Sequence, residues 1–206
     1  MILLEREFYT RDTITVSKEL LGKVLVHKTK EYSVAGRIVD AEAYMGPLDK
    51  AAHSYGGRKT PRVEIMYHEG GYSYVFTIYG MYQCFNIVTE KVGKPQAVLI
   101  RALEPVAGLE LMAQNRFNMD YRDLSNTQIK GLTNGPGKLC IAMKIGKEQN
   151  KIDICHKNGV DDIYVYDDGY SDFEVDASPR INIDYAEEYV LMPWRFFIKG
   201  NKYVSK

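Results

Sequence analysis

The stretch GRIVDAEAYMG at residues 36–46 alternates as a β-strand does and ends at a Gly-Pro break. Because side chains two positions apart share a face of a strand, Asp40, Glu42 and Tyr44 should project together. Ile38 precedes them on that face. The opposite face carries small apolar residues, which we assign to the core: Val39, Ala41 and Ala43. The stretch therefore predicts a strand that runs from the core of a sheet into a polar pocket.

Segments on either side of this strand favour further strands. Residues 23–30 alternate and lead through a short turn into 34–44, which predicts a β-hairpin. Tyr, Val, Ile and Phe dominate three more stretches, 72–79, 84–90 and 95–103, and these residue types are favoured in strands. The sequence thus predicts a curved, mainly antiparallel sheet.

Helix signals are fewer. Good helix formers over Val106–Phe117, with Pro105 near the start, predict one helix. A second is predicted to open with Asn134 as its N-cap and to continue over Lys138–Lys144. No repeat or long linker interrupts the chain, so we expect residues 1–206 to form a single domain of the α+β (mixed α/β) class, with surface helices.

The composition is that of a globular protein, with 206 residues of which 45% are hydrophobic and 26% charged. No apolar run is long enough to span a membrane, and Glu5 and Glu7 interrupt the apolar start that a secretory signal needs. We therefore expect an intracellular protein, in the cytoplasm of a prokaryote or in a nucleus. Three separated cysteines without a CxxC or HExxH motif indicate reduced thiols and no metal site: Cys84, Cys140 and Cys155.

The net charge is zero, but the charges are unevenly distributed. Residues 1–152 carry 21 Lys and Arg against 16 Asp and Glu, whereas residues 153–189 carry 2 against 11. Residues 190–206 have 4 basic and no acidic side chains. The simplest interpretation is an acidic, solvated flank, yet a basic face for a polyanion remains open if that segment packs elsewhere.

Two polar features carry candidate chemistry. Asp40 and Glu42 are close enough for one to raise the pKa of the other, as suits a general base, although paired acids are also typical of a solvated edge. The loop AAHSYGGRKTPR (51–62) places Arg58 and Arg62 beside glycines and hydroxyls. This composition suits phosphate contacts, and it is also that of an ordinary charged surface loop.

The segment YSYVFTIYGMYQCFN (72–86) holds six aromatic side chains. Alternation puts Tyr74 and Phe76 on one face, and the Tyr79-Gly80 pair is typical of a hairpin turn. Some of these rings belong to the core of the sheet. An aromatic side chain at an exposed turn needs a partner surface, and a wedge inserted into DNA is one such use.

Each of three other functions accounts for only part of this pattern. A sugar glycosidase would use Asp40 and Glu42 as acid and base, but side chains on one strand cannot easily flank a glycosidic bond from opposite sides. An RNA-binding module would use the aromatics and the basic loop, but has no need of Glu42 together with Arg101. The segment NGPGK (134–138) lacks the glycine spacing and the Ser or Thr of a nucleotide-hydrolysing phosphate loop.

Four motifs in a fixed order resemble those of the alkyladenine (3-methyladenine) DNA glycosylase family. They are RIVDAEAYMGPLDKAAHSYGGRKTPR (37–62), YVFTIYGMYQCFNI (74–87), VLIRALEP (98–105) and NGPGKLCIAM (134–143). The resemblance extends over about residues 4–204. It implies a monofunctional enzyme of base-excision repair, with a mixed sheet and a protruding hairpin that inserts into duplex DNA.

The resemblance also implies roles for individual residues. Glu42 matches the general base that activates water for attack on the sugar C1′. Arg101 matches the arginine that helps to hold this water, together with a backbone carbonyl near Ile181. Tyr44 and His53 match pocket residues that stack on and hydrogen-bond the flipped base, although His53 by itself would be typical of a structural histidine.

The aromatic hairpin supplies the remaining matches. Phe76 stands where the family often has Tyr, which keeps a stacking face and loses a hydroxyl. Asn86 matches the side chain that disfavours guanine by crowding its 2-amino group. Tyr79 matches the wedge that fills the gap in the base stack, with Met81 beside it. Asn182 replaces a glycine that the family commonly has near the water.

The implied partner is double-stranded DNA that contains 3-methyladenine, 7-methylguanine, hypoxanthine or ethenoadenine, bound by a monomer without cofactor or metal. Arg58 and Arg62 would contact the DNA backbone. Extruding a base costs a few kcal/mol, and stacking it on aromatic rings returns about 1–3 kcal/mol. No lysine matches a Schiff-base nucleophile, so we expect an abasic site without strand cleavage.

Overall fold

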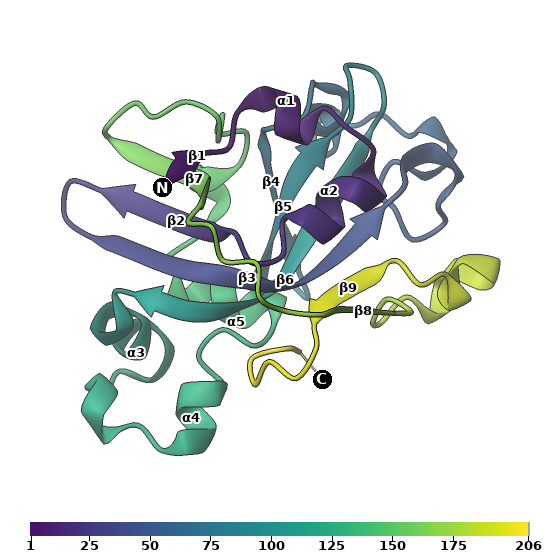
Figure 1. The fold of residues 1–206 in the computed structure, drawn as a ribbon. Coiled ribbons are helices and arrows are strands. Elements are labelled where there is room, and N and C mark those ends of the chain that lie inside the picture. Colours follow the sequence, from purple (N-terminus) through teal and green to yellow (C-terminus); the bar gives the residue numbers. More distant parts are fainter. Residues whose placement is uncertain (206) are drawn as a thin grey trace.

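The computed structural model describes residues 1–205 and shows, within them, nine strands in one sheet (Figure 1). The strands are β1 (Ile2–Leu3), β2 (Val24–Thr29), β3 (Ser33–Tyr44), β4 (Ser73–Ile78), β5 (Tyr82–Thr89), β6 (Gln96–Ala107), β7 (Asp161–Asp167), β8 (Val175–Ser178) and β9 (Arg195–Ile198). Their order across the sheet is β1, β7, β2, β3, β6, β5, β4, and each of these neighbours pairs in the antiparallel sense. The predicted α+β class with a mainly antiparallel sheet is confirmed.

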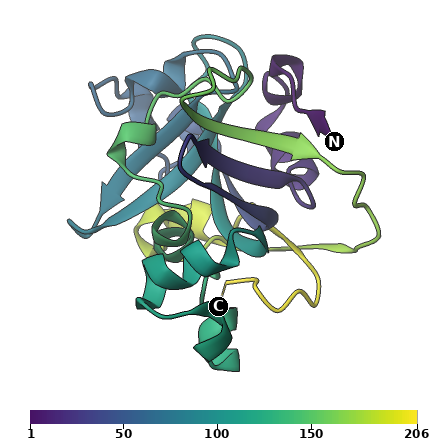
Figure 2. The same ribbon diagram turned by 90° about the vertical axis from the view of Figure 1, so that its left-hand side faces the viewer.

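Five α-helices within residues 1–205 flank the sheet. They are α1 (Arg6–Tyr9), α2 (Thr13–Glu19), α3 (Leu109–Phe117), α4 (Asn126–Lys130) and α5 (Pro136–Ala142). Helices α3 and α4 gather at one end of the molecule, whereas the β4–β5 hairpin reaches outward on another side (Figure 2). Among the described residues, no helix is both long enough and apolar enough to cross a lipid bilayer.

Strand β3 positions the polar stretch because it has three neighbours. Along one edge it pairs with β6 over most of its length. Along the other edge its first half pairs with β2 and its second half, Asp40–Glu42, pairs with β9. Strand β9 in turn pairs with β8. The carboxylates of β3 therefore lie where the sheet divides, close to residues from the C-terminal part of the chain.

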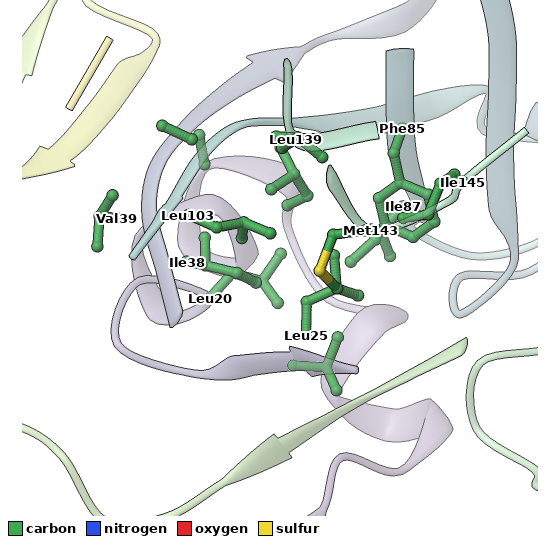
Figure 3. Close-up of a cluster of buried hydrophobic side chains, with 14 of the residues drawn as sticks. Leu20, Leu25, Ile38, Val39, Phe85, Ile87, Leu103, Leu139, Met143 and Ile145 are labelled. Atoms are coloured by element: carbon green, nitrogen blue, oxygen red, sulfur yellow. The ribbon is translucent and has the colours of Figure 1, made fainter. Parts of the chain in front are cut away.

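The main core lies between the sheet and the helices α2, α3 and α5, and Figure 3 shows part of it. Val39, Ala41 and Ala43 belong to this core, as predicted. Ile38, which strict alternation puts on the polar face, is buried in the same core. The reason is an irregularity: the register of β3 against β6 shifts between Ile38 and Asp40, and such bulges re-aim side chains.

Two details of the predicted helices are wrong. The first begins at Leu109, not near Val106, because β6 continues to Ala107 and includes Pro105. Proline fits there because β6 pairs with β5 only up to Leu99, so within residues 1–205 no strand pairs with Pro105 on that edge. The second begins after the N-cap Gly135, and Asn134 instead accepts a hydrogen bond from the Lys138 ammonium.

The acidic segment is part of the sheet rather than a solvated flank alone. Its strand β7 pairs with β1 and β2. Asp167 and Asp168 form ion pairs with Lys23 at 2.6 Å and with Arg37 at 2.8 Å. The hydrogen bonds from Arg37 lower the pKa of Asp168 to about 2. Two of the eleven acidic side chains of this segment are thereby paired with cations at or beside β2 and β3.

The turn of 3₁₀-helix η6 (Asp184–Leu191) contains a strained residue. Glu187 has φ 50° and ψ −125°, a conformation that favours glycine. Nζ of Lys50 lies 2.6 Å from a carboxylate oxygen of Glu187 and 2.8 Å from one of Glu188. Ala186 is fully buried beside them. Tertiary packing and this exposed ion pair hold η6 in place.

Glu187→Gly is therefore expected to stabilise the protein, by about 1 kcal/mol because the strain at this position disappears. The melting temperature should rise by about 2–4 °C for a chain of this size. Glu188→Gly is the matched control, since Glu188 shares the contact with Lys50 but has no positive φ. The control should melt at a lower temperature than the wild type. A lower melting temperature for Glu187→Gly as well would contradict the assignment of strain.

Candidate active site

Glu42 has no exposed surface. Its Oε1 accepts a hydrogen bond from the backbone N–H of Ile181 at 2.8 Å and lies 3.2 Å from Nη1 of Arg101. Its Oε2 accepts a hydrogen bond from the Tyr44 hydroxyl at 3.0 Å. The fold thus gathers three sequence-predicted residues around the Glu42 carboxylate. Ile181 contacts the carboxylate through its backbone N–H.

The environment of Glu42 suits this carboxylate to accept a proton. Burial raises the pKa of Glu42, and the charge of Arg101 and the N–H of Ile181 oppose this rise. Burial also raises the pKa of Tyr44 far above its ordinary value, with the neighbouring carboxylate as the second cause. Tyr44 therefore remains a neutral hydrogen-bond donor at physiological pH, and Glu42 is the basic group of the pair.

Asp40 is the second buried carboxylate of β3, and it has a different set of partners. Arg195 donates to it from Nε at 3.0 Å and from Nη2 at 2.9 Å. Ser205 donates to it from its backbone N–H at 3.1 Å and from its hydroxyl. Nε of Arg101 also donates to the Ser205 hydroxyl oxygen at 3.1 Å. Asp40 is thus a structural anchor, and Asp40 and Glu42 do not form the acid-base pair of a sugar glycosidase.

A cavity of about 440 Å³ opens in front of Glu42. Its lining includes seven residues that the sequence had singled out: Tyr44, His53, Phe76, Tyr79, Asn86, Arg101 and Ile181. Glu42 lies directly behind this wall, bonded to three of the lining residues. Three other predicted residues are not among the lining residues: Arg58, Arg62 and Met81.

His53 and Phe76 form one aromatic wall of the cavity. Their ring centroids are 4.5 Å apart, and Nδ1 of His53 is 2.7 Å from the Tyr74 hydroxyl. Burial lowers the pKa of His53 to about 4, and the charges of Arg62 and Arg58 act in the same direction. The imidazole is consequently neutral at pH 7. The guanidinium carbon of Arg62 lies 5.2 Å from the Phe76 ring centroid, so this side chain is placed at the edge of the aromatic wall.

The hairpin between β4 and β5 turns at Tyr79 and Gly80, as predicted. Their φ angles are 52° and 72°, and Met81 donates its N–H to the Ile78 carbonyl at 3.3 Å. Positive φ at both central residues matches the turn type that suits the twist of paired strands. The side chains of Tyr79 and Met81 are 75% and 69% exposed. Two large apolar side chains thus stand in solvent beside the cavity.

Two asparagines near the cavity have defined backbone roles. Asn86 is buried, and its Nδ2 donates to the carbonyl of Tyr74 at 3.0 Å. Asn182 has φ 60°, a left-handed conformation that asparagine tolerates better than most residues. Asn182 can therefore replace glycine without displacing the neighbouring Ile181 from Glu42.

Sequence reasoning missed several lining residues. Tyr185 in η6 and Arg116 in α3 border the cavity, and so does the segment 135–138, which we had set aside as a poor phosphate loop. A carbon added at Gly137 would lie 3.1 Å from Cβ of Tyr82, so a glycine permits α5 to approach the hairpin closely. Of these lining residues, only the closely spaced glycines of NGPGK (134–138) were recognisable in the sequence as a candidate site.

Comparison with known proteins gives the family of the chain. The model of the family described as methylpurine-DNA glycosylase matches residues 7–202. A protein of Desulfitobacterium hafniense is 54% identical over 202 residues, which cover 98% of each chain. A protein of Clostridium novyi is 56% identical over 203 residues, again 98% of each chain. Both are provisionally named 3-methyladenine DNA glycosylase. The chain belongs to the methylpurine-DNA glycosylase family.

Proposed function

We propose that this protein is a monofunctional DNA glycosylase that removes 3-methyladenine and related damaged purines from duplex DNA and leaves an abasic site. The observation that carries this proposal is the buried Glu42 carboxylate, held with Arg101 behind an aromatic-lined cavity. Membership of the methylpurine-DNA glycosylase family supports the same reaction. The related lesions would be 7-methylguanine, hypoxanthine and ethenoadenine.

The chemistry assigned to Glu42 is general base catalysis. A water molecule beside the carboxylate would give its proton to Glu42 as its oxygen bonds to C1′ of the sugar. The bond between C1′ and the purine nitrogen breaks, and its electron pair leaves with the base. 3-Methyladenine and 7-methylguanine carry a positive charge in the nucleotide, so they depart as neutral molecules and need no added proton. Hypoxanthine and ethenoadenine are neutral in the nucleotide, so they depart as anions that take a proton from water. Arg101 would orient the carboxylate and the water.

The cavity would hold the extruded base by stacking. Tyr44, His53 and Phe76 offer ring faces, each worth about 1–3 kcal/mol per stacked base. A cationic purine gains further from electron-rich rings. The neutral state of His53 suits this ligand, because an imidazolium would repel a cationic base.

The exposed hairpin would bind the duplex. Tyr79 and Met81 would enter the base stack where the damaged nucleotide has left it, as apolar wedges do in other proteins that distort DNA. Arg58 and Arg62 are exposed on the loop beside the cavity and would contact phosphates. We propose that one chain suffices for this binding, since one hairpin and one cavity serve one lesion.

The decisive experiment is a base-release assay on four duplexes, each with one of the four lesions. Heating in alkali after incubation converts abasic sites into strand breaks, and borohydride added during the reaction traps any Schiff base. We expect breaks only after alkali and no trapped complex. Breaks without alkali would refute the monofunctional assignment, and the absence of release from all four duplexes would refute the glycosylase itself.

Asn86→Ser tests how the cavity distinguishes purines. If the carboxamide occupies the space that a guanine 2-amino group needs, the smaller side chain should raise excision of guanine lesions relative to hypoxanthine, by about tenfold at the scale of pocket discrimination. Single-turnover rates on 7-methylguanine and on hypoxanthine give this ratio.

The alternative for Asn86 is a purely structural role, through its hydrogen bond to Tyr74. In that case both rates fall together and the ratio stays constant. A thermal melt of the variant completes the comparison, because a lost buried hydrogen bond costs about 1 kcal/mol. A constant ratio with a lower melting temperature would count against the specificity role.

A further inference from the structure

A buried ion pair, Arg180 with Asp49, lies beside the residues that hold Glu42 but has no part in the chemistry above. Nη1 of Arg180 is 2.6 Å from Oδ2 of Asp49, and Nη2 is 2.8 Å from Oδ1. Both side chains are completely buried. Such a bidentate pair fixes the orientation of both groups as well as their distance.

Arg180 connects the two segments that build the site around Glu42. Its Nη1 also donates to the carbonyl of Ala43 at 3.0 Å, and Ala43 lies between Glu42 and Tyr44 in β3. The residue after Arg180 is Ile181, whose N–H is bonded to Glu42. Arg180 therefore holds two segments together. One contains Ile181, whose N–H donates to Glu42, and the other is strand β3, which carries Glu42.

Asp49 extends this connection to the loop that follows β3. Its carboxylate accepts hydrogen bonds from the backbone N–H groups of Met45 and Ala51, each at 3.0 Å. Ala51 lines the cavity two residues before His53. The same pair thus holds the backbone of two segments that line the cavity, one with Ala51 and one with Ile181.

The guanidinium of Arg180 also packs against rings. Its carbon lies 4.7 Å from the Tyr44 ring centroid and 5.0 Å from that of Trp194. Tyr44 lines the cavity, so this contact restricts the plane that its ring offers to a base.

Stability alone is a weak explanation for this arginine. Buried ion pairs are often replaceable by apolar residues without loss of stability. Moreover, Nε of Arg180 is buried without a hydrogen-bond partner among residues 1–205, which is an unfavourable position for a donor. What the pair provides is a fixed geometry at the site.

We propose that Arg180, oriented by Asp49, is a positioning residue of the glycosylase: it fixes the N–H of Ile181 against Glu42 and the ring of Tyr44 against the extruded base. This inference rests on the proposed function, because it takes Glu42 as the general base. Neither Arg180 nor Asp49 contacts the reacting atoms in this assignment.

The pH dependence of excision reports on this role. The N–H of Ile181 lowers the pKa of Glu42, so loosening it should raise that pKa. A general base must be ionised, and excision therefore increases with pH through the pKa of Glu42. The acid limb of the profile should move to higher pH. Loosening Tyr44 acts in the same direction, because its hydroxyl also lowers the pKa of Glu42. The remaining groups that act on Glu42 stay in place: Arg101, Asp40, Cys84 and Tyr185.

The test compares two variants that keep the buried site occupied. Arg180→Lys keeps a cation for Asp49 but loses the second hydrogen bond, and Asp49→Asn keeps the size of the side chain but loses its charge. Single-turnover release of methylated purines from duplex DNA treated with dimethyl sulfate is measured against pH, beside a thermal melt. The matched control is Arg6→Lys, because Arg6 also forms a partly buried pair, with Asp153, away from the cavity.

We expect both variants to slow release at pH 7 by about tenfold or more, as misplaced catalytic groups do. Their acid limbs should move upward by about half a pH unit. The control should melt at a lower temperature with its acid limb unchanged. Acid limbs that stay at the wild-type position in both variants would overturn the inference. A wild-type protein without release, or full activity in Glu42→Gln, would instead overturn the proposed function beneath it.

Discussion

Glu42→Gln is expected to lower the single-turnover rate of methylpurine release by about 10²- to 10⁴-fold, which is the contribution of a positioned general base. The amide keeps the shape of the side chain and can still accept the N–H of Ile181. It cannot take a proton from water. Release is measured with enzyme in excess over a duplex that contains one lesion, and binding to the same duplex by fluorescence anisotropy should be nearly unchanged.

A matched substitution separates chemistry from general loss of charge. Glu64→Gln changes a half-exposed carboxylate outside the cavity lining, whose ion pair with Lys151 is long at 3.4 Å. This control should release bases at the wild-type rate. A melt of Glu42→Gln is also needed, because Arg101 loses a charged neighbour at 3.2 Å. Release by a folded Glu42→Gln variant at a rate near that of the wild type would refute the assignment of the base.

Tyr79→Ala should weaken capture of the flipped base in duplex DNA by about 5- to 100-fold, since a stacked ring contributes about 1–3 kcal/mol. On single-stranded DNA the loss should be much smaller, because only a duplex has a gap in the stack to be filled. The side chain is 75% exposed, so its removal should leave the melting temperature almost unchanged. Excision is measured on both substrates with the same lesion.

Tyr79→Phe is the control for this wedge. Both substitutions keep a non-glycine residue at φ 52°, so the backbone strain of the turn is the same in each. The phenyl ring should preserve most of the duplex activity. An equal loss on duplex and single-stranded DNA in Tyr79→Ala would show that Tyr79 belongs to the base pocket or to the folded hairpin instead of the wedge.

Local patterns predicted the strands around the site because their side chains repeat every two residues. The strand over residues 34–44 and the turn at Tyr79-Gly80 are both present in the structure. Alternation predicted the wrong face for Ile38. The shift in register at this residue is set by pairing with β6 and cannot be recognised in the local sequence. Pro105 was wrongly assigned to the start of a helix. A proline that suits a helix start equally suits a strand position that has no paired strand on one edge.

The candidate site was predictable where its residues lie in one motif and not where distant residues meet. The family resemblance carried Glu42, Arg101 and the aromatic wall. The pairing of Asp49 with Arg180 joins residues 131 positions apart, and that of Asp40 with Ser205 joins residues 165 positions apart. Periodicity and spacing contain no information on such pairs. The same limit explains why Asp40 and Glu42 looked alike in the sequence although their partners differ.

The hydrogen bonds of Ser205 have a consequence for the timing of activity during protein synthesis. A nascent chain that has reached residue 180 already contains Glu42, Arg101 and the aromatic wall. It lacks the N–H of Ile181, the guanidinium of Arg195 and the hydroxyl of Ser205, so Asp40 has no partner for its buried charge. The site can therefore close only after residues 181–205 have left the ribosome, and a ribosome-bound fragment with most of the motifs is expected to be inert toward DNA.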